Sequence, residues 1–218
     1  MDAANLFDPV AAAIVVGGTL VATLLRCGLH DFGHALAALG RIRSGRFDAE
    51  GVRAELAVQV QEIHRAGVLS ANPRHFTDRA FDEVADVLIN KRSVPALIAA
   101  HESQKAHRVE ADDRAVRTLT QAAELSPVFG LVGTLFSLTN LAADGISRDS
   151  YAGAISTAVL TTLYGLLLAN LLLGPLARLV ERAASAEGLQ RQEIVDWLAE
   201  QVAPDVPRGK PVAVAEVV

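Results

Sequence analysis

Hydroxyl groups and one amide interrupt a long apolar run that spans residues 151–180. The run is long enough to cross a bilayer and contains no charged residue before Arg178. Hydrocarbon cannot satisfy polar side chains, so a polar stripe in a membrane helix usually faces other helices or a water-filled path. The run is therefore predicted to line an intramembrane pathway rather than to act as a simple anchor. Its polar side chains are Thr157, Thr161, Thr162, Tyr164 and Asn170.

Helical geometry divides the threonines of this run between two faces. Thr157 and Thr161 are four positions apart and share one face. Thr162 is offset by about 100° and groups with small residues, namely Ala158, Gly165 and Ala169. Small residues let two membrane helices approach closely, so this second face is predicted to contact another helix.

Residues 125–143 form a second apolar segment that contains one more threonine. Gly130 and Thr134 are four positions apart, and with Gly133 they are predicted to allow close helix packing. The hydroxyl of Thr134 either lines a path or bonds back to its own helix. Pro127 is expected in the first turn of this helix, where its missing N–H costs little.

A third apolar segment extends from about Phe7 to Leu25 and follows acidic rather than basic residues. It is therefore predicted to be a retained membrane helix and not a signal peptide. The apolar cores of all three segments lack Asp, Glu, Lys, Arg and His. Proton pathways normally use a titratable side chain at mid-membrane, so an ion pathway here would need a carboxylate from a partner.

Composition agrees with a few membrane helices plus a sizeable aqueous portion, since 51% of the 218 residues are hydrophobic and 21% are charged. The net charge of −5 gives no indication of nucleic-acid binding. Nucleotide-binding loops, nucleophile elbows and metal-spaced Cys/His clusters are absent from the sequence, so no enzyme, cofactor or metal is predicted. His30 and His34 have a metal-compatible spacing, but no third ligand accompanies them.

Basic residues flank the three segments in a pattern that orients the chain. Arginines follow the first segment, precede the second and follow the third, which places the N-terminus outside and the C-terminus in the cytoplasm. The predicted fold is an all-α integral membrane protein with three transmembrane helices and a helical cytoplasmic loop. Its predicted parts are a first transmembrane helix (1–25), the loop (26–124), a transmembrane hairpin (125–180), a C-terminal helix (181–202) and a disordered tail (203–218).

Apolar residues recur at helical spacing in the loop, which predicts two helices there. They are Val52, Leu56, Val60 and Ile63 in the first helix and Phe81, Val84, Leu88 and Ile89 in the second. The C-terminal helix is predicted to carry Leu189, Ile194, Trp197 and Leu198 on or near one face.

Three stretches resemble the MotA/TolQ/ExbB proton-channel family. SPVFGLVGTL at 126–135 is similar to its Ala-Pro-x-x-Gly-x-x-Gly-Thr-Leu signature. STAVLTTLYGLLLANLLLGPLA at 156–177 resembles its last helix, including the Thr-Thr-Leu-Tyr-Gly core. FDPVAAAIVVGGTLVATLL at 7–25 is similar to a helix of the flagellar stator A-subunit, and this element favours the MotA/PomA branch.

The resemblance implies a homopentamer of A-type subunits in the bacterial inner membrane. It would surround a MotB-like single-span partner whose intramembrane aspartate carries H⁺ or Na⁺, and a cytoplasmic rotor protein is a further expected partner. Thr134, Thr161 and Thr162 match the family's pore-side threonines, and Pro127 matches the proline of its penultimate helix. Tyr164 and Gly165 fall within the signature of the last helix and are expected to serve helix packing, whereas Pro127 is expected in the ion pathway with the three threonines.

Two other functions are compatible with the sequence. The layout of three helices with an outside N-terminus is that of ExbB and TolQ, which implies an energiser of outer-membrane transport or envelope integrity with an ExbD/TolR-like partner. Ala96 or its neighbours lie where the stator branch carries a rotor-contacting arginine. A membrane scaffold without transport is the third possibility, and it predicts that the threonines are dispensable.

Overall fold

The computed structural model describes residues 8–45, 47–66, 76–143, 148–204 and 206. Within these ranges all regular secondary structure is helical, which confirms the all-α prediction. Most of the predicted tail (203–218) and part of the connection between the second and third apolar segments (144–147) lie outside the described residues. The chain forms two compact units, each built from two stretches of sequence, and α4 and α6 contribute to both.

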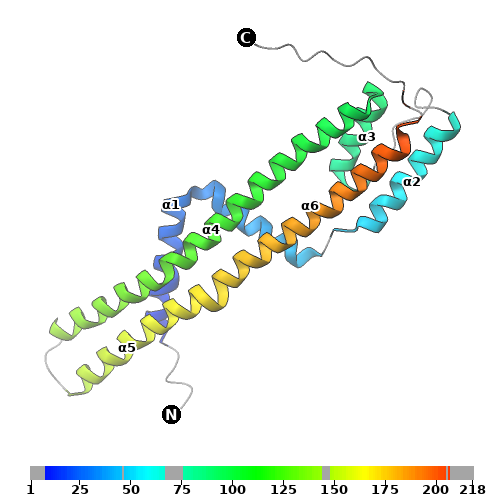
Figure 1. Ribbon diagram of the computed structural model, residues 1–218. Helices are drawn as coiled ribbons and strands as arrows, with labels where there is room; N and C mark the ends of the chain where they lie inside the picture. Colours follow the sequence, from blue (N-terminus) through cyan, green and yellow to red (C-terminus); the bar gives the residue numbers. More distant parts are fainter. Residues whose placement is uncertain (1–7, 46, 67–75, 144–147, 205, 207–218) are drawn as a thin grey trace, which may run out of the picture. The chain divides into compact units, whose positions relative to one another are not determined.

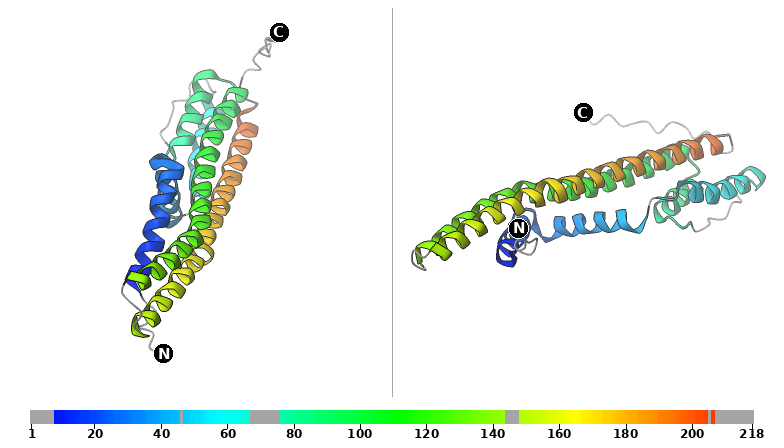
Figure 2. Two further views of the ribbon diagram at one scale, coloured as in Figure 1. Left: turned by 90° about the vertical axis from the view of Figure 1, so that its left-hand side faces the viewer. Right: turned by 90° about the horizontal axis from the view of Figure 1, so that it is seen from below.

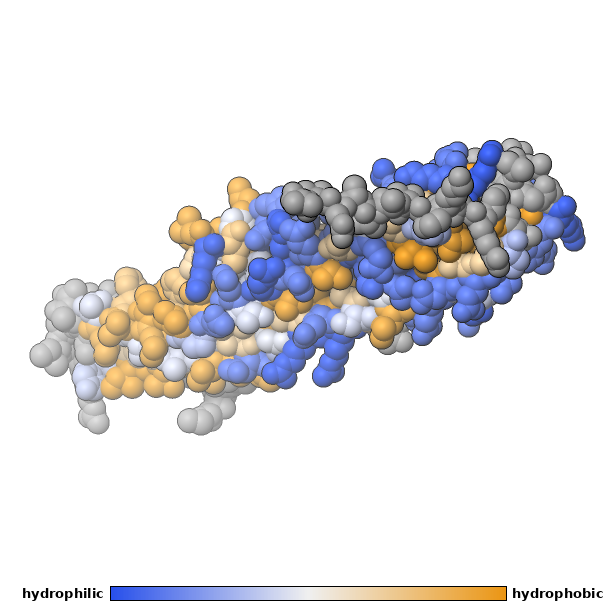
Figure 3. Space-filling view, turned by 45° about the horizontal axis from the view of Figure 1, so that its top comes forward, coloured by the Kyte–Doolittle hydropathy of each residue, from blue (hydrophilic) through white to orange (hydrophobic). Residues whose placement is uncertain are grey.

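Three helical stretches are long and apolar enough to cross a membrane, as the sequence predicts. They lie at Pro9–Ser44, Val94–Thr139 and Tyr151–Val202. Their outward side chains are strongly apolar, with Leu25 exposed by 83%, Leu171 by 70% and Leu135 by 66%. Figure 3 shows apolar side chains gathered where the end of α4 and the start of α5 lie. Such a surface needs lipid or other membrane helices to cover it.

The first helix, α1 (Pro9–Ser44), begins at a defined cap and changes direction in its middle (Figure 1). Asp8 accepts hydrogen bonds from the backbone N–H groups of Val10 and Ala11, and Pro9 occupies the first helical turn, where a proline is tolerated. Gly28 has φ of +83°, a conformation that favours glycine and separates two helical stretches. The helical chain therefore continues well beyond residue 25, where the sequence analysis ends the first membrane helix.

The first unit comprises residues 1–45 and 110–184. The second part of α4 (Val94–Ala143) runs beside α5 (Arg148–Leu167), as both views of Figure 2 show. A π-helical segment, η2 (Leu168–Leu173), joins α5 to α6 (Gly174–Val202). A small apolar cluster holds α1, α4 and α6 together through Ala35, Ala38, Ala115, Leu119, Ala177 and Val180.

The second unit comprises residues 46–109 and 185–218 and has the larger apolar core. Its helices are α2 (Ala49–Ala66), α3 (Arg79–Lys91), the start of α4 and the end of α6. The periodic positions predicted from the sequence are buried, including Leu56 and Ile63 in α2 and Val84 and Leu88 in α3. Leu189 was predicted near the apolar face of the C-terminal helix, but it is 68% exposed because that face consists of Ile194, Val195, Leu198 and Val202.

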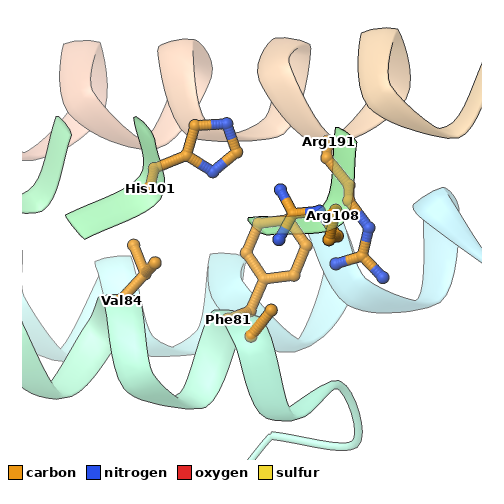
Figure 4. Close-up of a pocket in the computed structure, with 6 residues that line it drawn as sticks. Phe81, Val84, His101, Arg108 and Arg191 are labelled. Atoms are coloured by element: carbon orange, nitrogen blue, oxygen red, sulfur yellow. The ribbon is translucent and has the colours of Figure 1, made fainter. Parts of the chain in front are cut away.

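The side chain of Arg191 is buried in this second unit (Figure 4). Arg191 donates two hydrogen bonds to the Asp78 carboxylate, at 2.6 and 3.1 Å, and one to Glu187 at 2.8 Å. Its guanidinium lies 4.2 Å from the centre of the Phe47 ring. Burial alone would raise the pKa of Asp78, but the hydrogen bonds and charge of Arg191 outweigh it and the pKa falls. The Arg191–Asp78 pair therefore links α6 to the start of α3.

His101 of α4 faces the same pocket as Phe81, Arg108 and Arg191 (Figure 4). The residue is only 3% exposed, and its Nε2 atom has no hydrogen-bond partner among the described residues. Burial lowers the pKa of His101, and the nearby charge of Arg108 lowers it further. The neutral imidazole is therefore favoured in the folded state.

We expect this histidine to make the second unit acid-sensitive. An unfolded histidine takes up its proton near pH 6.5, whereas the folded His101 resists protonation, so the free energy of unfolding falls as pH drops below about 6.5. The loss reaches at most about 1.4 kcal/mol per pH unit. Thermal unfolding of the full chain at pH 7.5 and 5.5 measures this slope. His101→Gln should reduce it, whereas His107→Gln, at an exposed position of the same helix, should not. Equal slopes in the two variants would contradict the assignment.

Candidate functional site

The helices α4 and α5 approach each other so closely that glycine is required at the contact. A Cβ atom added to Gly165 would lie 2.7 Å from the Ser126 carbonyl oxygen and 3.1 Å from the Gly130 Cα. One added to Gly133 would lie 2.7 Å from the Thr161 Cγ2 atom. A real Cβ atom essentially never lies within 3.0 Å of such a neighbour, so the glycines at 165 and 133 allow the two signature stretches to touch.

Across this contact the structure brings two of the predicted threonines together. The Oγ1 atoms of Thr134 and Thr162 are 3.4 Å apart. Thr134 also donates to the Gly130 carbonyl at 2.9 Å, and Thr162 approaches the Ala158 carbonyl at 3.3 Å. Both side chains are half-buried. A hydroxyl that has donated its proton to a carbonyl retains two lone pairs, so this pair can accept hydrogen bonds or coordinate a cation.

Thr161 has a different environment from the other two predicted pathway threonines. It is completely buried, donates to the Ala158 carbonyl at 2.9 Å and packs against Gly133. Within one subunit its hydroxyl is thus enclosed between α4 and α5. Its proposed role in the ion pathway stays a prediction, as do the roles of Thr134 and Thr162.

Pro127 lies deep inside α4 and not in a first turn, so the interpretation as a helix start is wrong. The helix that begins at Val94 continues through the expected membrane boundary, and the proline therefore interrupts its hydrogen bonding. The residue before it, Ser126, donates its buried hydroxyl to the Ala122 carbonyl of the same helix at 2.8 Å. The Pro127 Cα atom would be 3.2 Å from a Cβ atom on Gly165, so the proline also belongs to the helix contact.

Asp8 is a site residue that the sequence analysis missed. Its Oδ2 atom accepts a hydrogen bond from Thr157 Oγ1 at 3.0 Å, and its backbone N–H donates to the Tyr164 hydroxyl at 3.1 Å. A carboxylate therefore lies beside two hydroxyls of α5, although it precedes the apolar core of α1. The Asp-Pro pair could have revealed it, because that pair is typical of a helix start and predicts a capping carboxylate.

Gly18 explains one part of the Val-Val-Gly-Gly-Thr element of α1. A Cβ atom at this position would lie 2.2 Å from the Phe129 ring of α4, so the ring occupies the space that the missing side chain leaves. The neighbouring Gly17 has nothing within 4 Å. The first glycine of the pair is thus free of packing constraints within the subunit, whereas the second holds α1 against α4.

The two histidines after the Gly28 break lie close together. The His30 and His34 rings are 4.6 Å apart in an edge arrangement, and His30 Nδ1 is 3.4 Å from Arg114 Nη1. Among the described residues, no group of three or more His, Cys, Asp and Glu side chains could hold a metal ion.

Comparison with known proteins decides the family. Residues 70–193, which include the α4–α5 contact, match the model of the MotA/TolQ/ExbB proton channel family. The chain belongs to this family. The resemblance inferred from the signature stretches is therefore confirmed, and with it the interpretation of the chain as a membrane protein.

Proteins named for chemotaxis or motility are among its relatives. Chemotaxis protein PomA from Vibrio alginolyticus is 23% identical over 190 residues, which cover 87% of this chain and 75% of PomA. Motility protein A from Cereibacter sphaeroides is 27% identical over 200 residues, which cover 89% of this chain and 78% of that protein.

Solved structures share the fold of this family member. The flagellar MotAB stator complex from Bacillus subtilis contains a chain that matches with a TM-score of 0.78 at 18% identity, covering 93% of this chain and 81% of that one. The C. jejuni MotAB structure matches with a TM-score of 0.76 at 14% identity, covering 97% of this chain and 89% of that one.

Proposed function

We propose that this chain is the A-type subunit of an ion-driven membrane motor, a stator that couples ion flow to torque in the bacterial inner membrane. Its relatives include proteins named Motility protein A and PomA, and its fold matches chains of MotAB complexes. The observation that carries the proposal is the meeting of the Thr134 and Thr162 hydroxyls, 3.4 Å apart, across the α4–α5 contact.

In this proposal the chain supplies hydroxyls and a partner supplies the charge. The apolar cores of the three segments contain no Asp, Glu, Lys, Arg or His side chain, so the mid-membrane carboxylate comes from a MotB-like single-span subunit. The lone pairs of Thr134 and Thr162 stabilise H⁺ or Na⁺ as it reaches that carboxylate. Five copies of the chain surround the partner helices, and the second unit acts on a rotor protein. The chain performs transport and mechanical work rather than catalysis of a covalent reaction.

An ExbB/TolQ-like energiser is the second candidate, because the matching family model covers TolQ and ExbB as well as MotA. Purification from the native membrane through a C-terminal tag separates the two functions by the partner that accompanies the chain. A partner with a membrane aspartate and a peptidoglycan-binding domain supports the stator, and an ExbD/TolR-like partner supports the energiser. The absence of any partner with an intramembrane carboxylate would refute both.

The threonine pair gives a direct test of conduction. We expect the double variant Thr134→Val and Thr162→Val to reduce ion flux at least about tenfold, because each lost hydroxyl removes roughly 1 kcal/mol or more of stabilisation from the moving ion. Flux is measured with a pH- or Na⁺-sensitive dye in proteoliposomes that contain the complex with its partner. Thr139→Val is the control, since the hydroxyl of this exposed threonine of α4 donates to the Phe136 carbonyl of its own helix. Equal flux in wild type and double variant would remove the threonines from the pathway.

A further inference from the structure

The helix α5, which carries Thr161 and Thr162, is followed directly by the π segment η2 at Leu168–Leu173. π segments are rare, usually one turn long, and frequent at functional sites. This one lies directly between the Thr161–Gly165 contact with α4 and the Ala177–Val180 contact with the apolar cluster of the same unit.

Local sequence accounts for the π geometry. The Gly174 backbone N–H bonds to the Ala169 carbonyl, five residues back instead of four. A Cβ atom on Gly174 would lie 3.1 Å from that same oxygen, so glycine relieves a tight contact. Pro175 has no N–H to continue an α-helical ladder. The Asn170 side chain donates to the Leu166 carbonyl at 3.0 Å and satisfies an acceptor at the start of the segment.

The buried positions show what the π turn achieves. Ala158, Thr161, Gly165 and Ala169 recur every three or four residues, as one face of an α-helix does. The next buried positions are Ala177 and Val180, and the step from Ala169 to Ala177 is eight residues. In a continuous α-helix this step would turn the face by about 80° beyond two full turns. One π turn of roughly 4.4 residues and one α turn of about 3.6 residues together close two turns in eight residues.

We propose that η2 sets the rotation of α6 about the helix axis relative to α5, and that Gly174 and Pro175 are the residues that position it. It keeps the threonine face of α5 and the Ala177–Val180 face of α6 directed at the same helix, α4. Without it, the two faces diverge, and either the threonines or the apolar cluster loses its contact. The consequence for ion flux rests on the proposed function, whereas the consequence for packing does not.

The proposal can be tested by changing the rotation of α6 relative to α5 and then restoring it. The variant Gly174→Ala/Pro175→Leu favours α-helix and should turn the Ala177 face away by about 80°. Deleting Leu171, an exposed residue, from this variant shortens the step to seven residues and returns the face to within about 20° of two turns. Gly188→Ala is the control, because nothing lies within 4 Å of a Cβ atom there.

Two quantities are measured for each variant. The first is ion flux of the complex with its partner. The second is crosslinking by a short bis-maleimide between cysteines placed at positions 119 and 177, in a protein whose native Cys27 is replaced by serine. We expect the substitutions to reduce crosslinking and flux at least fivefold, and the deletion to restore both. Restoration also supports the proposal if the first variant is unfolded. Wild-type crosslinking in the substituted variant, or failure of the deletion to restore it, would overturn the proposal. A wild-type complex without flux would refute the proposed function and leave the crosslinking test intact.

Discussion

Gly165→Ala is expected to separate α4 from α5 and to abolish ion flux. The new methyl group would lie 2.7 Å from the Ser126 carbonyl oxygen, and backbone atoms on both sides leave no rotamer to relieve the clash. Overpacking of this kind typically costs about 1–3 kcal/mol. The movement also separates the hydroxyls of Thr134 and Thr162, which now lie 3.4 Å apart. Thermal unfolding in detergent and dye-based flux in proteoliposomes measure the two effects.

Gly153→Ala is the matched control for this substitution. Gly153 belongs to the same helix, and nothing lies within 4 Å of a Cβ atom at that position. Alanine is a better helix former than glycine, so this variant should retain stability and flux. If Gly165→Ala behaves like Gly153→Ala, the close contact does not exist in the assembled protein.

Arg191→Leu is expected to cause the largest loss of stability in the second unit. The Arg191 side chain is only 9% exposed, and its removal leaves the Asp78 carboxylate, itself 18% exposed, without its cation. Breaking a buried pair from one side typically costs about 3–5 kcal/mol. The stacking on Phe47 is lost at the same time. Hydrogen exchange of the α3 and α6 amides should increase sharply while α5 is unaffected.

Two further variants separate the ion pair from general packing. Arg79→Leu removes an arginine that is 93% exposed and only 3.5 Å from Glu83, so it should change stability by less than about 1 kcal/mol. Adding Asp78→Asn to Arg191→Leu removes the unpaired charge and should recover part of the loss. An Arg191→Leu protein as stable as the Arg79→Leu protein would show that the pair does not stabilise the unit.

The predicted membrane helices depended on local properties of the sequence. The length of each apolar run and the flanking arginines depend on neighbouring residues alone, and the three span-capable helices agree with them. The helical periodicity of α2 and α3 predicted buried residues such as Leu56 and Leu88 for the same reason. The prediction for Leu189 is wrong because a single apolar residue at an approximate spacing does not define which face of the helix packs against the core.

Site residues were harder to predict because they depend on how helices meet. Hydroxyl content and spacing could select Thr134, Thr161 and Thr162 together, but not distinguish the enclosed Thr161 from the adjacent pair. Pro127 was assigned to a helix start because the apolar run begins near it, whereas α4 begins at Val94. Asp8 was missed because it lies outside the apolar core, although α1 brings it to Thr157.

The sequence by itself determined the family, the number of apolar helices and the absence of Asp, Glu, Lys, Arg and His from their cores. These properties reside in the composition and order of short segments. Only the tertiary structure decided which hydroxyls meet, because that depends on the rotation of each helix about its axis and on the glycines that set the distance between helices. The π segment before Gly174 shows the difference most clearly. One extra residue in a turn leaves the apolar pattern almost unchanged, yet it redirects every side chain that follows.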